Sequence, residues 1–224
     1  MENKILVAGG TGRTGRIIVK NLLANGIHPH LLVRDRLKAE TLFGKDVILH
    51  TGDVRNFETL LEPMDGVDTV ISAIGTCTPV GKNCPKRVDY QGVANLVKAA
   101  QVKGIKRFIL ISSIAVTHPE HPMNRFGRIL DWKLKGEEAL RQSGLNYTIV
   151  RPGGLTDTPG GKCALIFSQG DQVLGTISRE DLAATCLQLL DTSHPSQITF
   201  EVVNCEECNP PDLSGLFSAL LPDQ

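Results

Sequence analysis

Short apolar runs alternate with longer segments of helical periodicity along most of the chain. Runs rich in leucine and β-branched residues predict strands at 4–8, 30–33, 47–49, 68–73, 108–112 and 147–150. Apolar residues that recur every three or four positions predict helices at 13–25, 88–103 and 129–142, with shorter helices from 37 and over 56–61. The remainder predicts a short strand near 173, a helix at 180–190, a strand at 198–203 and a last helix after 211.

This alternation predicts an α/β protein with right-handed crossovers between parallel strands. Residues 4–8 are apolar on both faces, as a strand must be when helices cover both sides of the sheet. The expected fold is a Rossmann-like, doubly wound parallel sheet in a single domain, residues 1–224, in which 155–224 form the variable, substrate-side part. Ligands of such sheets bind at the carboxyl ends of the strands, so residues at those ends are the first candidates for function.

The composition argues against several classes of function. The 24 Lys and Arg residues balance the 24 Asp and Glu residues, and aromatic residues make up 4%. This balance predicts no basic surface for nucleic acid or anionic membrane, and few rings for stacking bases. No apolar run approaches the roughly 18 residues that cross a bilayer, and the start MENKILVAGGTG does not read as a secretory signal. Six scattered cysteines fit reduced thiols. We expect a cytoplasmic monomer that binds neither nucleic acid nor membrane.

A glycine-rich segment joins the first strand to the first helix, and it reads Gly9-Gly10-Thr11-Gly12-Arg13-Thr14-Gly15. Glycines at 9, 12 and 15 allow a tight turn, close approach of a diphosphate and close packing of the helix on the strand. The helix then offers free amides and its positive dipole end to the phosphates. A glycine-rich turn alone would be weak evidence, but its place between a strand and a helix strengthens it. The expected dinucleotide contacts are Gly9, Thr11, Gly12, Arg13, Thr14 and Gly15.

The residues after the second strand bear on the choice between NAD and NADP. NAD-binding folds normally end this strand with an acidic residue that accepts a hydrogen bond from the ribose 2′-hydroxyl. Here Arg34 takes the first exposed place, and Arg13 lies in the facing glycine-rich turn. Two guanidinium groups suit a doubly charged 2′-phosphate, so the sequence favours NADP(H). The alternative is that Asp35 binds the ribose and that the cofactor is NAD.

The motifs GGTGRTG, LLVRD, TGDV, ISAIG, ILISS and IVRPGG follow one another in order, with a lysine-bearing helix before the last. This order resembles the atypical short-chain dehydrogenase/reductases of the NmrA-like, NAD(P)-binding branch, over nearly the whole chain. Within that branch, the length, the VRD turn and the GTISREDLA segment are similar to the biliverdin reductase B/flavin reductase group. The resemblance implies a Rossmann-like fold and a nicotinamide cofactor bound across successive strand ends.

The resemblance also implies a role for each strand end. The implied cofactor contacts are Asp53 and Val54 at the adenine, Ala73, Ile74 and Gly75 at the ribose, Ser112 at the fifth strand, and Pro152, Gly153, Gly154 and Leu155 at the nicotinamide. Ser113 matches the family's active-site serine. Each position also has a plain structural explanation, since Asp53 could cap a turn and the two serines could merely end a strand. Their occurrence at successive strand ends favours the functional interpretation.

A typical member of this superfamily uses Tyr-x-x-x-Lys on the helix before the sixth strand. Aligning Lys135 with the family lysine puts Asp131 in the tyrosine position, and choosing Lys133 puts Ile129 there, so the phenol is absent either way. Two positions apart on a helix is about 200°, so both lysines cannot face the cofactor. The family register selects Lys135 as the catalytic and cofactor-binding lysine. Both lysines could instead be solvent-facing partners of nearby glutamates.

Hydride transfer to a planar acceptor survives the loss of the phenol, because water can supply the proton. The sequence therefore predicts an NADPH-dependent oxidoreductase whose small-molecule acceptor is a flavin (FMN or FAD) or a linear tetrapyrrole such as biliverdin. Ser113 and Lys135 are its expected catalytic residues. The alternative is a non-catalytic NADP(H)-binding redox sensor or scaffold of the NmrA-like type. No metal is expected, because His118 and His121 are interrupted by proline and lack an evident third ligand.

Overall fold

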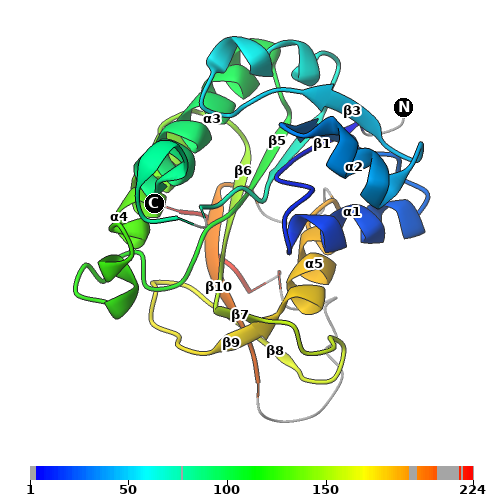
Figure 1. Ribbon diagram of the computed structural model, residues 1–224. Helices are drawn as coiled ribbons and strands as arrows, with labels where there is room; N and C mark the ends of the chain where they lie inside the picture. The colour runs from blue at the N-terminus through cyan, green and yellow to red at the C-terminus, as the bar shows by residue number, and fades with distance from the viewer. Residues whose placement is uncertain (1–3, 77, 192–195, 206–216, 218, 224) are drawn as a thin grey trace.

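The computed structural model describes residues 4–76, 78–191, 196–205, 217 and 219–223, and its centre is an eight-stranded sheet (Figure 1). The strand order is β3-β2-β1-β4-β5-β6-β10-β8, and β8 alone runs antiparallel to its neighbour. The strands are β1 (Ile5–Ala8), β2 (His30–Val33), β3 (Ile48–Thr51), β4 (Thr69–Ser72), β5 (Arg107–Ile111), β6 (Tyr147–Pro152), β8 (Leu165–Ser168) and β10 (Ile198–Asn204). The order reverses at β1, where β2 and β4 flank it, so a crevice opens at the carboxyl ends of β1 and β4.

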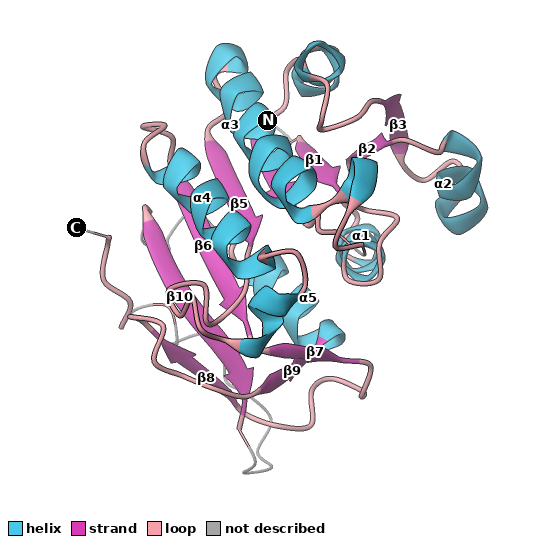
Figure 2. Ribbon diagram, turned by 60° about the vertical axis from the view of Figure 1, so that its left-hand side comes forward, coloured by secondary structure: helices cyan, strands magenta, loops and turns pink. Residues whose placement is uncertain are grey.

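Helices cover both faces of this sheet (Figure 2). They are α1 (Gly15–Ala24), α2 (Arg36–Phe43), α3 (Gln91–Lys103), α4 (Ile129–Arg141) and α5 (Arg179–Gln188). Side chains of α1 and α5 share one apolar cluster, and those of α3 and α4 share another on the opposite face. Within the described residues, none of these helices combines the length and the apolar character needed to cross a membrane.

The first strand shows why the sheet is buried on both sides. Ile5 and Val7 belong to the cluster under α1 and α5, whereas Leu6 and Ala8 belong to the cluster under α3 and α4. All four side chains are at most 1% exposed. The prediction of a doubly wound, Rossmann-like single domain is thereby confirmed.

Several predicted elements differ in detail from those observed. The predicted helix at 56–61 is a short 3-10 turn, η1 (Phe57–Leu60), and the first turn of the predicted helix at 88–103 is a π-helix, η4 (Lys86–Tyr90). The strand expected near 173 is β9 (Thr176–Ser178), which pairs with β7 (Gly154–Thr156) in a separate two-stranded sheet. The helix expected after 211 falls outside the described residues.

Two strands escaped prediction for the same reason. β7 and β8 lie at the margins of the fold, and only one of their residues, Leu165, is buried. Such strands carry little apolar periodicity, so the sequence pattern does not mark them. Because β8 and β10 extend the main sheet, the described part of 155–224 shares the core of the domain. The substrate-side role of that segment stays a prediction.

A buried ionic network fixes the rotation of α4 over the sheet. Arg151 on β6 donates to both carboxylate oxygens of Glu137 on α4, at 3.1 and 2.7 Å, and to Glu201 on β10 at 3.4 Å. Both glutamate side chains are fully buried. Burial raises the pKa of Glu201 even though Arg151 counteracts this effect. One helical turn before Glu137, Lys133 occupies the same sheet-facing side of α4.

Replacing Arg151 tests this network. An Arg151→Met variant leaves the buried Glu201 without its ion-pair partner and Glu137 with Arg141 alone, so the free energy of unfolding should fall by about 3–5 kcal/mol. Arg36→Met is the matched control, because Arg36 and Glu40 form an exposed i,i+4 pair worth about 0.5 kcal/mol or less. Urea denaturation followed by circular dichroism measures both losses. Equal losses in the two variants would show that the buried network does not hold α4 in place.

Candidate functional site

The turn after β1 lies so close to the end of β4 that it has no room for side chains. Gly9 has φ +86°, and a Cβ atom there would lie 2.6 Å from the carbonyl oxygen of Ala73. A Cβ atom on Gly15 would collide with the Gly9 carbonyl, and Gly12 donates its amide to that same carbonyl at 2.9 Å. Backbone amides rather than side chains therefore form the floor of the crevice at the strand-order reversal.

The amino terminus of α1 opens onto this turn. Thr14 stands in the cap position but makes no side-chain capping hydrogen bond. The amides of Arg13, Thr14 and Gly15 make no hydrogen bond to any part of the chain that the structure describes. Free amides at the positive end of a helix dipole suit the phosphate groups of a dinucleotide.

A cleft of about 300 Å³ lies at the carboxyl ends of β1, β2 and β4. Its lining includes nine of the predicted cofactor residues: Gly9, Thr11, Gly12, Arg34, Asp53, Val54, Ala73, Ile74 and Gly75. It also includes residues that the sequence analysis did not single out: Leu32, Val33, Lys38, Gly52, Arg55, Thr76, Thr78, Asn83 and Val88. The volume is of the size of a small-molecule site, and residues from four separated segments converge on it.

Basic side chains gather where this cleft meets the end of β2. Arg34 and Lys38 line it, and among the described residues neither forms an ion pair. Arg34 donates to the side-chain oxygen of Asn83 at 3.0 Å, so the loop after β4 reaches over to β2. Asp53 is bound by Arg55, whose hydrogen bonds outweigh burial and lower the pKa of the Asp53 carboxyl. Asp53 is therefore ionised and can only accept hydrogen bonds.

Asp35 has a structural task instead of a place in the cleft. Its carboxylate accepts a hydrogen bond from the backbone amide of Lys38 at 3.0 Å and so caps α2. It is absent from the lining of the cleft, whereas Arg34 and Lys38 on either side of it are present. The geometry thus gives no support to Asp35 as the ribose ligand.

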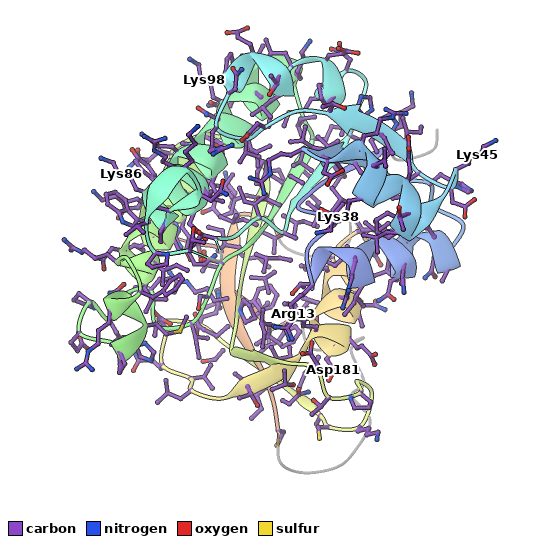
Figure 3. The ribbon with its side chains drawn as sticks, in the orientation of Figure 1. Arg13, Lys38, Lys45, Lys86, Lys98 and Asp181 are labelled. Carbon is purple, nitrogen blue, oxygen red and sulfur yellow. The ribbon has the colours of Figure 1, made fainter. Side chains whose placement is uncertain are left out.

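Arg13 and Arg34 do not come together. Arg13 forms an ion pair with Asp157, which follows β7, and it is not among the residues that line the cleft beside Arg34. Figure 3 shows Arg13 near the beginning of α5, well apart from Lys38 on α2. The structure therefore does not bring Arg13 and Arg34 together in the cleft, and their joint binding of one phosphate stays a prediction. Lys38, in the first turn of α2, is the cation that lines the cleft together with Arg34.

A second hollow, too small to admit a water molecule, lies beside the cleft at the end of β5, and Ile74 lines both. Its polar members are Asp89, Ser112 and Lys133. The Lys133 ammonium lies 3.0 Å from the Asp89 carboxylate, and these side chains are 15% and 0% exposed. The buried Ser112 hydroxyl has no hydrogen-bond partner in the described part of the chain. Asp89 also accepts from the Thr76 amide at 3.2 Å, which joins this hollow to the loop after β4.

Lys135, the lysine selected by the family register, points elsewhere. It is exposed, and its ammonium lies 5.0 Å from the ring centroid of Trp132 on the outer surface of α4. The two lysines lie on different sides of α4, as expected, but Lys133 is the one that faces the interior. The position of Glu137 could have indicated which lysine faces inward. Glu137 is buried, and Lys133, four residues before it, lies on the same side of the helix, whereas Lys135 does not.

The predicted residues at the ends of β5 and β6 lie outside the main cleft. Ser113 is partly exposed, directly after the buried Ser112. Gly153 lies against Gly175, where a Cβ atom would be 2.5 Å from the Gly175 carbonyl oxygen. The Gly154 amide donates to that carbonyl at 2.9 Å, and Leu155 is 37% exposed. Pro152 is the last residue of β6, which pairs with β5 in the sheet. The residues that follow β6 therefore lie at the same edge of the sheet as Ser113, which follows β5.

Asp171 holds the loop that follows Ser113. Its buried carboxylate accepts hydrogen bonds from the amides of Ala115 at 2.6 Å and Thr117 at 2.9 Å, and from the Thr117 hydroxyl at 2.8 Å. Burial alone would raise the pKa of Asp171, but these hydrogen bonds outweigh it and keep the pKa below its usual value. Ala115 adopts φ +63°, a conformation that these contacts help to maintain. The chain after β5 is therefore shaped by a carboxylate more than fifty residues away.

Comparisons with known proteins identify the family and the fold of the chain. A family model described as NAD(P)H-binding matches residues 9–193. An uncharacterized chloroplastic protein of Arabidopsis thaliana is 33% identical over 83% of this chain, which spans 65% of that relative's length. The sanguinarine reductase of Eschscholzia californica is 29% identical over 88% of both chains.

Among solved structures, a putative NAD-dependent epimerase/dehydratase from Bacillus halodurans superposes with a TM-score of 0.81 and 28% identity. The match covers 92% of this chain and 96% of the other. The family match begins at Gly9, in the glycine-rich turn, and extends over most of the fold. The chain belongs to the NAD(P)H-binding family, and its Rossmann-like fold is that of the atypical short-chain dehydrogenase/reductases.

Proposed function

We propose that this protein is an NADPH-dependent reductase of planar acceptors such as a flavin or a linear tetrapyrrole. The observation that carries the cofactor part is the pair Arg34 and Lys38 in the cleft, with Asp35 engaged as a helix cap. Two cations without a carboxylate partner suit the 2′-phosphate that distinguishes NADP from NAD. The family match and a relative named as a reductase support oxidoreductase chemistry.

In this proposal the cofactor lies across the strand ends. The amides at the start of α1 bind the diphosphate, and the adenine lies beside Asp53 and Val54. Ala73, Ile74 and Gly75 flank the adenosine ribose, and the segment from Pro152 to Leu155, with Ser112, borders the nicotinamide. Bound NADPH would supply a hydride to the acceptor. Lys133 replaces Lys135 as the lysine beside the cofactor, because it alone reaches the hollow at the end of β5.

The catalytic contribution of the chain is mainly positional. Ile129, four residues before Lys133, is apolar and buried, so no phenol stands ready to donate a proton. Water supplies the proton, and Lys133 and Ser113 orient the cofactor and the acceptor. The missing phenol equally suits a non-catalytic NADP(H) sensor or scaffold, which would bind the cofactor without turnover. A cytoplasmic location and a monomeric state belong to the same proposal.

Cofactor choice is tested at Arg34. An Arg34→Ala variant should weaken NADP⁺ binding by about 10- to 100-fold, the worth of a charge-assisted hydrogen bond, and change NAD⁺ binding little. Lys38→Ala should have the same selectivity. Lys45→Ala, at an exposed lysine after α2, is the control. Isothermal titration calorimetry with both nucleotides measures the ratio, and equal losses for NADP⁺ and NAD⁺ would overturn the 2′-phosphate assignment.

The two lysines of α4 provide a matched test of catalysis. NADPH oxidation with FMN, FAD or biliverdin should be measurable, and Lys133→Met should lower kcat/KM by about tenfold or more. Lys135→Met should leave turnover unchanged, because Lys135 lies on the outer surface. Thermal melts show whether each variant is folded. Tight NADPH binding without oxidation, across a broad acceptor panel, would favour the sensor and reject the reductase.

A further inference from the structure

One carboxylate connects two arginines beside the glycine-rich turn. Asp157 presents one oxygen to Arg13, in the turn itself, and the other to Arg179, the first residue of α5, at 2.8 Å. Arg13 and Arg179 are more than 160 positions apart in the chain, yet they share this single partner. Neither Asp157 nor Arg179 was singled out by the sequence.

The two halves of this bridge differ in burial. The Arg13 and Asp157 side chains are 63% and 59% exposed, so their ion pair contributes only about 0–1 kcal/mol. The Arg179 side chain is 10% exposed, and its Nε atom has no hydrogen-bond partner in the described part of the chain. A buried guanidinium retains its counter-ion strongly, because leaving it unpaired is costly. Asp157 therefore stays with Arg179, whereas Arg13 can leave at little cost.

The loop that carries Asp157 is anchored independently of Arg13. The amide of Gly160 donates to Glu180 at 2.8 Å, and the amide of Gly161 donates to Asp181 at 2.7 Å. Both acceptors lie in the first turn of α5, next to Arg179. The carboxylate is thus held beside the turn whether or not it pairs with Arg13.

Arg13 belongs to the same turn whose free amides suit a diphosphate. We infer that Arg13 is a ligand of the cofactor diphosphate and that Asp157 is an internal anion that competes with the diphosphate for it. This inference rests on the proposed cofactor site, and it gives Arg13 a partner different from the 2′-phosphate. Binding transfers Arg13 from Asp157 to the diphosphate, while Asp157 keeps its ion pair with Arg179.

Two consequences follow from this competition. The negative charge of Asp157 weakens binding of any nucleotide that carries the diphosphate, whether or not it has a 2′-phosphate. The weakening is electrostatic between exposed groups, so it declines as ionic strength rises. A reductase that exchanges its cofactor at every turnover thereby releases the oxidised form sooner.

The test uses two nucleotides that separate the two phosphate sites. ADP-ribose carries the diphosphate without a 2′-phosphate, and 2′-AMP carries the 2′-phosphate without any phosphate at the 5′ position. An Asp157→Asn variant should bind ADP-ribose about two- to fivefold more tightly at low salt, which corresponds to the upper half of the range for an exposed pair. Its affinity for 2′-AMP should change much less. Asp46→Asn, which makes the same charge change at an exposed position after α2, should alter neither affinity.

A double-mutant cycle completes the test. Arg13→Gln should weaken ADP-ribose, NAD⁺ and NADP⁺ alike, and in that background Asp157→Asn should no longer have an effect. Unchanged or weaker ADP-ribose binding by Asp157→Asn would overturn the competition. Selective loss of NADP⁺ affinity in Arg13→Gln would return Arg13 to the 2′-phosphate. If the unmodified chain bound neither nucleotide, the proposed cofactor site would fail, and this inference with it.

Discussion

The close contact between the turn after β1 and the end of β4 is the constraint on which the whole site depends. Gly9 touches the Ala73 backbone, and Gly15 touches Gly9, so any side chain at either position would separate the strands. The contact leaves a row of amides uncovered at the start of α1, directly at the reversal of strand order. Every other group in the site is arranged around this bare stretch of backbone.

The basic residues around that backbone differ in whether a carboxylate of the protein already pairs with them. Arg151 is satisfied inside the fold by two buried glutamates, and it serves to orient α4. Arg34 and Lys38 face the cleft with no carboxylate in ion-pair distance among the described residues, so their charge is available to a ligand. Arg13 lies between these cases, since its partner Asp157 is itself largely exposed. These three environments predict different roles for basic residues that the sequence alone does not distinguish. A buried pair orients a helix, an unpaired cation binds a ligand, and an exposed pair can exchange its partner.

Local sequence patterns predicted the backbone of the site. The orientation and the partners of its side chains depend on contacts between residues far apart in the chain. The turn from Gly9 to Gly15 and the strand ends at Asp53 and Ala73 each follow from a few neighbouring residues. The choice between Lys133 and Lys135 depends on the phase of α4, which a contact between α4 and β6 sets. Arg13 pairs with a residue 144 positions away, which no local pattern encodes. The sequence could have indicated Lys38. Asp35 is a typical helix-capping residue, and the amide of Lys38, three residues later, is the group that donates to it.

The position that holds a catalytic tyrosine in typical members of the superfamily has no phenol in this chain, and this affects how an acceptor could be bound and protonated. Where a tyrosine would define one reacting oxygen, this chain has the buried Ile129 and an ammonium held by Asp89. In the proposed reductase, no protein acid would fix the position of one carbonyl, so a flat ring system that takes its proton from water would be a suitable acceptor. Discrimination among acceptors would then depend on the loops that follow the strand ends. The contact of Gly127 with Pro79 joins the loops after β4 and β5, and the hydrogen bonds of Asp171 join the loop after β5 to the segment between β8 and β9.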